Sequence, residues 1–316
     1  MPLRVAFFGT PGFAVPTLQH LVDSPHAVVG VITQPDKPRG RGQQITVGPV
    51  KALALSVGVP VLQPERLARD QFDAAFTALG ADIGVVAAYG KILPDWLLAT
   101  PRLGLVNVHA SLLPRYRGAS PVHRAVIAGD AETGVTIMRV VKALDAGSML
   151  AEVRVAIGVD DTTTLVESVL AIRGAELLVH TLEAIEAGTA RETPQDESLV
   201  TYAPKLAKTE GLIDWSMPSM RIHNLVRGLW PWPHAFTHLA GRRYIVHRSR
   251  VSHLAPGIAA AGTVVMASAI EGLHVACGAG TALELVDIQL EGKRVVSARD
   301  LMASKAWLAG AGFTTP

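Results

Sequence analysis

The first half of this chain alternates short apolar runs with stretches of helical periodicity. Gly, Pro and Asp punctuate the boundaries between them. Such alternation is typical of a doubly wound, mostly parallel α/β sheet whose strands are buried on both faces. The expected strands are residues 5–9, 28–33, 59–63, 83–88, 103–108 and 150–157, and the expected helices are residues 14–22, 50–57, 72–79 and 162–187.

The pattern changes after a polar segment that carries Pro194 and Pro204. One helical stretch is followed by short alternating segments broken by Gly and Pro, which predicts a small β-barrel of the oligonucleotide-binding type. That helix is expected at residues 217–228 and the strands at 235–239, 244–247, 262–266, 273–277 and 282–289. With 316 residues, two domains are the natural expectation. We place the first at residues 1–189, a linker at 190–206 and the C-terminal domain at 207–316.

Composition narrows the class of protein. Hydrophobic residues make up 49% of the chain, enough for a large core, yet no run is long enough to span a membrane. The N-terminus leads directly into a strand pattern and lacks a signal-peptide core. A single cysteine, Cys277, cannot form an intramolecular disulfide. We expect a cytoplasmic enzyme.

Positive charge is concentrated in the C-terminal part. The net charge is only +2, but residues 206–316 hold 11 Lys and Arg against 7 Asp and Glu, together with six of the 11 histidines. A basic C-terminal domain favours a polyanionic partner. An ordinary solvated surface explains the charge count equally well.

The most informative local motif is Asn107-Val-His109, where an apolar strand runs out into a loop, together with the distant Asp145. Open α/β sheets place their chemistry at such strand ends. An amide can hold a developing oxyanion, an imidazole can move a proton, and a carboxylate can orient the imidazole. No Ser or Cys stands in a nucleophile context, so these residues predict direct acyl transfer to an external amine.

Several weaker features point elsewhere. Gly9-Thr-Pro-Gly12 resembles part of a dinucleotide fingerprint but lacks its spacing, and Asp36 reads as part of a turn, so nicotinamide binding is disfavoured. The histidines form no metal-binding motif, and we expect no metal. Trp230-Pro-Trp232-Pro is either a base-stacking platform or, as we favour, a packed aromatic corner.

Residues 34–49 form a long stretch rich in Gly and Pro. Lys37, Arg39 and Arg41 lie in it, and Lys51 follows closely. A loop of this length without secondary structure is usually functional or disordered. Its composition fits a basic arm that orders against phosphate, and fits a solvated surface loop equally well.

These residues resemble a known family. Asn107-Val-His109, the run from Ser111 to Pro121 and Leu144-Asp145-Ala-Gly147 are similar to the signature of the 10-formyltetrahydrofolate-dependent formyltransferases. The segments that resemble the branch acting on methionyl-tRNA are residues 9–14, 34–42, 202–206 and 213–216, and the similarity extends to residue 301. The resemblance implies transfer of the formyl group from 10-formyltetrahydrofolate to the α-amine of initiator methionyl-tRNA. The product would be N-formylmethionyl-tRNA for translation initiation.

The resemblance also implies roles for individual residues. Asn107, His109 and Asp145 would be catalytic, and either His109 or Asp145 would accept the amine proton. The residues implied in folate binding are Ser111, Leu112, Leu113, Pro114, Tyr89 and Gly90. The residues implied in tRNA binding are Arg41, Arg39 and Lys37, beside a tRNA-binding C-terminal domain, in a protein that is a monomer.

Other functions share some of these features. A formyltetrahydrofolate hydrolase or a sugar-nucleotide formyltransferase would use the same three catalytic residues, but the sugar enzyme would not need the basic loop and basic barrel. A glycinamide-ribonucleotide formyltransferase would end near the first domain. A non-catalytic RNA-binding protein on an inactive α/β domain is a further alternative, against which the intact Asn107, His109 and Asp145 argue.

Overall fold

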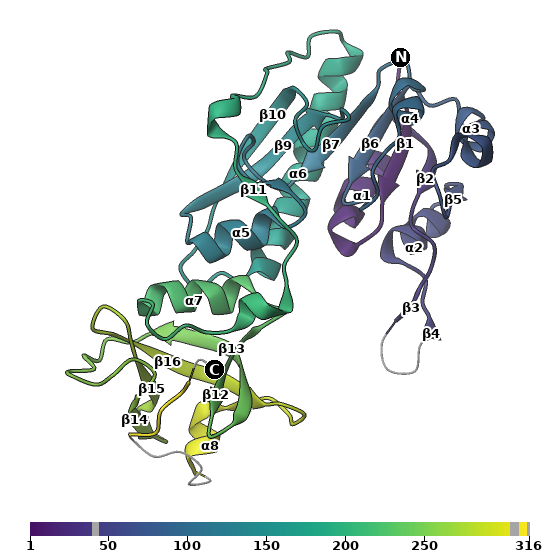
Figure 1. Ribbon diagram of the computed structural model, residues 1–316. Helices are drawn as coiled ribbons and strands as arrows, with labels where there is room; N and C mark the ends of the chain where they lie inside the picture. Colours follow the sequence, from purple (N-terminus) through teal and green to yellow (C-terminus); the bar gives the residue numbers. More distant parts are fainter. Residues whose placement is uncertain (40–43, 304–309, 315–316) are drawn as a thin grey trace. The chain divides into compact units, whose positions relative to one another are not determined.

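The computed structural model describes residues 1–39, 44–303 and 310–314 (Figure 1). By its internal contacts the chain forms two compact units. The first unit contains Met1–Pro121, Thr133–Val155 and Glu167–Ala203. The second contains Val122–Glu132, Ala156–Val166 and Pro204–Pro316. The second unit therefore includes two segments that precede residue 189, the expected end of the first domain. The predicted domain bounds at residues 189 and 207 stay a prediction.

A seven-stranded sheet forms the centre of the first unit, in the order β10-β9-β7-β6-β1-β2-β5. Its strands are β1 (Arg4–Gly9), β2 (Ala27–Ile32), β5 (Val61–Leu62), β6 (Ile83–Ala87), β7 (Leu105–His109), β9 (Glu132–Arg139) and β10 (Met149–Ala156). The pairs β1–β2, β1–β6, β2–β5 and β6–β7 are parallel, whereas β7 and β9 are antiparallel. The predicted mostly parallel α/β fold is confirmed. The sequence pattern does not predict β9, because its buried Thr133 and Thr136 interrupt the apolar run.

Helices and an aromatic core complete this unit. The helices are η1 (Gly12–Ala14), α1 (Val15–Asp23), α2 (Pro49–Ser56), α3 (Arg69–Thr77), α4 (Asp95–Ala99) and most of α6 (Thr163–Glu186). The helix α5 (Pro121–Ala128) belongs to the second unit except for Pro121. Proline in the first turn starts α1 and α2, where its missing N–H costs no hydrogen bond.

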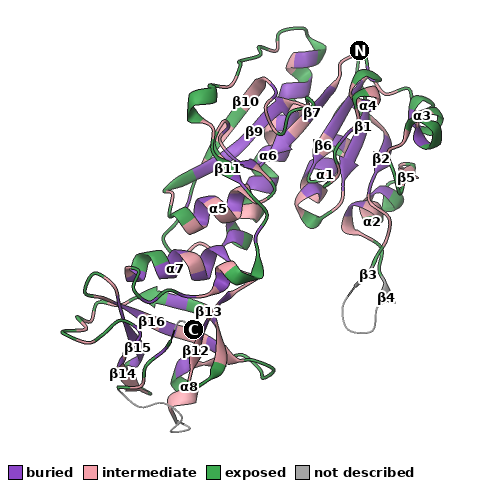
Figure 2. Cartoon of the chain, in the orientation of Figure 1, coloured by how far each residue is buried: buried purple, intermediate pink, exposed green. Residues whose placement is uncertain are grey.

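Phe8 packs edge-on against Tyr89, with ring centroids 5.6 Å apart, in a core that Figure 2 shows as buried strands. Within the described ranges, none of the helices has the length and apolar character needed to cross a bilayer.

Two segments expected to be irregular contain short strands. In the 34–49 loop, β3 (Pro38–Arg39) pairs with β4 (Gln44–Ile45) as an antiparallel hairpin. In the expected linker, η2 (Glu197–Leu199) precedes β11 (Tyr202–Ala203), which pairs in parallel with β8 (Arg117–Gly118). Two-residue strands are too short to give a periodic sequence signal, so the sequence could not predict them.

The second unit contains an antiparallel sheet in the order β12-β13-β16-β15-β14, with β17 beside β16. Its elements are η3 (Lys208–Gly211), α7 (Ser219–Gly228), β12 (Ala235–Leu239), β13 (Arg242–Val251), β14 (Val264–Ser268), β15 (Gly272–Cys277), β16 (Thr281–Leu290), β17 (Val296–Ser297) and α8 (Ala298–Ala303). Residues 310–314 hydrogen-bond to Gly262 and Val264 on one side and to His238 of β12 on the other. This closure of the two edges is consistent with the predicted barrel. Cys277 is buried, and burial raises the pKa of its thiol to about 12.

Candidate active site

Strand β7 places Asn107 and His109 on one face of the sheet, because side chains two residues apart in a strand point the same way. Val108 points to the other face. There it lies so close to Gly174 of α6 that a Cβ at Gly174 would come within 2.9 Å of it. The side chain of Asn107 is half-buried and has no hydrogen-bond partner in the part of the chain that the structure describes. Its amide is therefore available to a reactant.

The His109 ring is held by the backbone of the following loop. Its Nε2 lies 3.1 Å from the carbonyl oxygen of Tyr116. Because a carbonyl only accepts, Nε2 carries the hydrogen and donates it. The other ring nitrogen, Nδ1, lies 3.7 Å from Asp145 Oδ2. This separation is too long for a hydrogen bond but suits an ion pair when the ring is charged, so Nδ1 is the nitrogen that can exchange a proton.

Asp145 is fixed in an unusual backbone conformation. Its φ of 47° lies in the left-handed region, which Asp and Asn tolerate better than most residues. Its Oδ2 accepts a hydrogen bond of 2.8 Å from the backbone N–H of Gly118. Gly118 has φ 123°, and a Cβ there would lie 2.8 Å from the carbonyl oxygen of Ala203. Glycine is therefore required where the two loops meet.

The predicted folate segment, Ser111 to Pro114, follows His109 directly. Thr136 of β9 holds it: its hydroxyl donates to the Ser111 carbonyl at 2.8 Å and accepts from the Leu113 N–H at 3.1 Å. Ser111 and Leu113 are buried, whereas Leu112 and Pro114 are partly exposed. Folate contacts by Ser111 and Leu113 would therefore be made mainly through backbone atoms.

The loop after β6 carries Tyr89 and Gly90. The Tyr89 side chain is 1% exposed and lies in the aromatic core, where burial raises its pKa to about 12. Its carbonyl accepts a hydrogen bond of 2.8 Å from Gln34 Nε2. Gly90 has φ 77°, a conformation that favours glycine. The expected folate contact of Tyr89 is thus restricted to its backbone, and that contact stays a prediction.

The basic loop is only partly described. Lys37 is exposed, the side chain of Arg39 is not described, and Arg41 lies outside the described residues. Lys51 donates to Asp36 and Gln63, and its hydrogen bond to Asp36 holds the pKa of that carboxyl below its usual range. The charge of Lys51 is therefore already paired with Asp36.

The structure brings His109 and Asp145 into contact and places Asn107 on the same face of β7. Sequence reasoning missed three side chains that support them: Thr136, Arg117 and Gln195. Each acts across a large separation in sequence, so no local pattern could have identified it. Among the described residues, no three His, Cys, Asp or Glu side chains gather as a metal would require.

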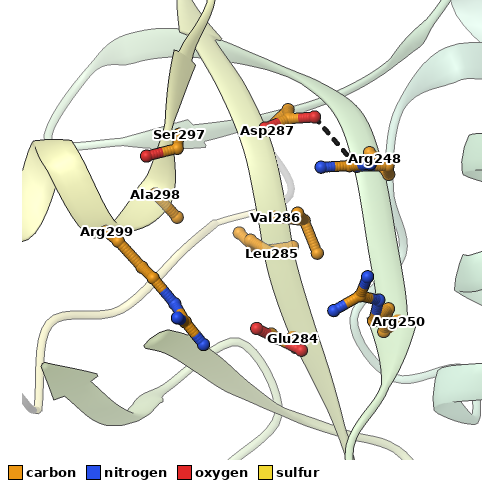
Figure 3. A pocket seen from close by; sticks show the side chains of 9 residues that line it. All are labelled: Arg248, Arg250, Glu284, Leu285, Val286, Asp287, Ser297, Ala298 and Arg299. Atoms are coloured by element: carbon orange, nitrogen blue, oxygen red, sulfur yellow. Dashed lines mark ion pairs between the residues drawn. The ribbon is translucent and has the colours of Figure 1, made fainter. Parts of the chain in front are cut away.

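A cavity of about 250 Å³ lies in the second unit (Figure 3). Arg250 of β13 and Arg299 of α8 lie on either side of Glu284 of β16, while Arg248 pairs with Asp287 at 2.9 Å. The side chains of Arg250 and Arg299 are exposed, and no ion pair within the described ranges neutralises them. Such guanidinium groups suit phosphate binding.

The sequence matches two protein-family models, "Formyl transferase" over residues 3–182 and "Formyl transferase, C-terminal domain" over residues 205–306. A methionyl-tRNA formyltransferase of Methylococcus capsulatus is 46% identical over 308 residues, which is 98% of each chain. One of Geobacter metallireducens is 42% identical over 303 residues, 95% of each chain.

Solved structures share the fold at lower identity. The N-formyltransferase of Helicobacter canadensis, in complex with folinic acid and dTDP-3-aminofucose, has a TM-score of 0.69 and 16% identity. The similarity covers 90% of this chain and 98% of that one. HypX of Aquifex aeolicus, in complex with tetrahydrofolic acid, has a TM-score of 0.63 and 14% identity, covering all of this chain and 51% of that one.

Proposed function

This chain belongs to the methionyl-tRNA formyltransferase family, and we propose on that basis that Asn107, His109 and Asp145 perform its chemistry. The enzyme transfers the formyl group of 10-formyltetrahydrofolate to the α-amine of initiator methionyl-tRNA. The product is N-formylmethionyl-tRNA, used in translation initiation. The observation that carries this function is an identity of 42–46% over nearly the full length of curated relatives with that activity.

The proposed reaction begins when the methionyl amine attacks the formyl carbon. A C–N bond forms, the formyl oxygen becomes an oxyanion, and a tetrahedral intermediate results. The free amide of Asn107 donates a hydrogen bond to that oxygen. Because His109 Nε2 is occupied by the Tyr116 carbonyl, only Nδ1 of the ring can add a second donor. Fixed donors of this kind stabilise an oxyanion strongly in a site from which water is excluded.

Asp145 completes the proposed mechanism. Its carboxylate faces His109 Nδ1 and stabilises the charged form of the ring. It also accepts, directly or through water, the proton that the attacking amine loses. The bond between the formyl carbon and N10 then breaks, and N10 takes up a proton as tetrahydrofolate leaves. In this assignment His109 stabilises the oxyanion and Asp145 is the proton acceptor.

Substrate binding is divided between the two units in this proposal. In the first unit, the backbone of Ser111–Pro114 and of the Tyr89–Gly90 turn binds the folate. Lys37, Arg39 and Arg41 bind the acceptor end of the tRNA, and the exposed arginines of the second unit bind its phosphates. A monomer located in the cytoplasm, where translation takes place, is part of the proposal.

A second formyl acceptor, an amino sugar attached to a nucleotide, deserves testing. A solved relative with the same fold was crystallised with dTDP-3-aminofucose, but it is only 16% identical. At that level the likeness concerns the fold alone. The excess of Lys and Arg in residues 206–316 favours tRNA, because a nucleotide sugar presents few phosphates.

An acceptor competition tests the proposed function. Purified protein is given labelled 10-formyltetrahydrofolate with methionyl-tRNA, unacylated tRNA, glycinamide ribonucleotide, a dTDP-amino sugar or buffer alone. We expect labelled N-formylmethionyl-tRNA and no comparable turnover with the other acceptors. Preferential formylation of the amino sugar, or release of formate at the same rate without acceptor, would overturn the assignment.

A further inference from the structure

Residues 193–203, the connecting segment, are bound to the loop that follows His109 and to the loop that carries Asp145. Thr193 exchanges two backbone hydrogen bonds of 2.8 Å with Met149, just beyond the Asp145 loop. Thr201 accepts at Oγ1 from the Tyr116 N–H at 2.9 Å and at its carbonyl from the Arg117 N–H at 2.9 Å. The connecting segment lies between the regions that match the two formyl transferase models, residues 3–182 and 205–306.

Gln195 makes the central contacts of the connecting segment. Its Nε2 donates two hydrogen bonds of 2.8 Å, to the carbonyl oxygens of Asp145 and Gly147. Its Oε1 accepts from Arg117 Nε and Nη2 at 3.0 and 2.8 Å. Carbonyls only accept and a guanidinium only donates, so this amide orientation is the one that satisfies all four bonds. Its neighbours Pro194 and Asp196 are exposed, whereas Gln195 is half-buried.

Arg117, which donates to Gln195 Oε1, is deeply buried. Its side chain is 4% exposed, and it also pairs with Glu197, at 2.8 Å between Nη2 and Oε1. A guanidinium this deeply buried is stable only when its donors are satisfied, so it fixes the Gln195 amide in place. The next residue, Gly118, donates its N–H to Asp145 Oδ2. Asp145 is therefore held at its carbonyl by Gln195 and at its carboxylate by Gly118.

We propose that Gln195 is a positioning residue for formyl transfer, which holds the Asp145 loop against His109 by bridging Arg117 to the carbonyls of Asp145 and Gly147. The inference rests on the proposed function of Asp145. The left-handed backbone of Asp145 needs such external support, because this conformation is less stable than extended or helical backbone. Within the connecting segment, Gln195 is the side chain that supports the Asp145 loop.

The decisive substitution is Gln195→Glu. It keeps the side-chain size and an acceptor for Arg117, but it places a carboxylate oxygen where an amide N–H₂ faced two carbonyls. The Asp145 loop must then shift or lose both bonds. Misplacing a catalytic group by about 1 Å can cost about 10²-fold in rate. We expect kcat to fall about 10- to 100-fold while KM for folate and for methionyl-tRNA changes less than about twofold.

Asp196→Asn is the matched control. It is an isosteric acid–amide exchange at the next residue, whose carboxylate contacts only Ser198 within the described part of the chain. This variant should retain wild-type kcat and KM. If Gln195→Glu retained wild-type kcat, or raised KM without lowering kcat, the positioning role would be refuted.

A double-mutant cycle with Asp145→Asn shows whether Gln195 acts through Asp145. We expect Gln195→Glu to lower kcat much less in the Asp145→Asn background than in the wild type. Equal fold-losses in both backgrounds would contradict the proposal. If Gln195→Glu fails to fold by thermal unfolding, Gln195→Met, which removes the donors without adding charge, enters the same cycle. Wild-type turnover with methionyl-tRNA tests the proposed function separately, since the inference depends only on the ratios between variants.

Discussion

The loops around His109 and the arginine-lined cavity of the second unit use polar side chains in opposite ways. His109 is 5% exposed, and the loop that carries Asp145 is fixed by hydrogen bonds from Gly118 and Gln195, which are 27 and 50 residues away in sequence. Arg250 and Arg299 are exposed on a barrel surface. In the first region most polar groups are bound to one another, and the Asn107 amide is the exception among the described residues. The second region leaves positive charge available to solvent or a ligand.

This difference matches the tasks proposed for the two regions, which are formyl transfer and tRNA binding. Stabilising a transition state requires donors held at fixed distances, so that no reorganisation is needed during the reaction. Binding a phosphate backbone requires positive charge more than fixed geometry, because its affinity comes largely from counterion release. Substitutions in the first region should therefore lower kcat, and substitutions in the second should raise KM for tRNA.

The largest expected effect comes from the three residues proposed to be catalytic. His109→Ala, Asn107→Ala and Asp145→Asn should each lower kcat by about 10²- to 10³-fold in steady-state formylation assays. In Asp145→Asn, the amide oxygen can still accept from the Gly118 N–H, so thermal unfolding should change little. Combining two of the substitutions should cost far less than the product of the single losses. Near-wild-type kcat in any variant would remove that residue from the mechanism.

Gly147→Ala tests how tightly the Asp145 loop is packed. A Cβ at Gly147 would lie 1.8 Å from the carbonyl oxygen of Arg139, so the backbone must move. We expect a loss of about 1–3 kcal/mol in the free energy of unfolding, measured in urea, together with a fall in kcat. Gly188→Ala is the comparison, since a Cβ there meets no atom within 4 Å, although its φ of 68° adds some strain. It should leave kcat unchanged, and equal kcat losses in the two variants would contradict tight packing at Gly147.

The arginines of the second unit should affect binding alone. Arg250→Ala combined with Arg299→Ala should raise KM for methionyl-tRNA several-fold at moderate salt. The slope of log affinity against log salt should fall by about one unit per lost phosphate contact. Arg173→Ala is the control, because Glu176 already pairs with Arg173 at 3.0 Å. An unchanged salt dependence in the double variant would exclude this cavity from the tRNA site.

Tyr89→Phe should have the smallest effect at neutral pH. The hydroxyl is buried without a partner among the described residues, so its removal should leave the free energy of unfolding unchanged or raise it by about 1 kcal/mol. In the folded protein its pKa is raised to about 12. The unfolded chain ionises near pH 10, so between about pH 10 and 12 this residue should lower stability by about 1.4 kcal/mol per pH unit. Urea unfolding of the variant should not show this loss of stability between about pH 10 and 12. If the variant were less stable than the wild type at pH 7, the hydroxyl would have a partner.

Regular elements, and the common face of Asn107 and His109, could be predicted from the sequence. The apolar run that ends at His109 is β7, and the alternating segments of the C-terminal part are β12 to β16. These predictions succeeded because periodicity reports directly which side chains become buried. Asn107 and His109 stand two residues apart, so their common face follows from strand geometry alone.

Long-range polar contacts could not be predicted. The segment around Gln195 looks like a linker because it is polar and contains proline, yet Gln195 contacts Arg117, 78 residues earlier. Thr136 reads as an interruption in an apolar strand, but its hydroxyl fixes the backbone of Ser111 and Leu113. Such roles depend on which loops meet in the fold, and a single sequence carries no signal for that.

Deleting the C-terminal part cannot separate chemistry from tRNA binding, because a cut after Leu206 would also deprive residues 122–132 and 156–166 of the rest of their compact unit. Point substitutions in the full chain avoid this problem. Such substitutions leave both units intact, and each one changes either the chemistry or the tRNA binding.

The central claim is that the residues around His109 perform the chemistry and the arginines of the second unit bind tRNA. Single-turnover formyl transfer at saturating methionyl-tRNA and 10-formyltetrahydrofolate tests this claim most directly, because saturation removes differences in affinity. The Arg250→Ala, Arg299→Ala double variant should react at the wild-type rate, whereas His109→Ala should react about 10²- to 10³-fold more slowly. Equal rates for His109→Ala and wild type, or a comparable loss in the arginine variant, would contradict the assignment of chemistry to the His109 loops and of tRNA affinity to the second unit.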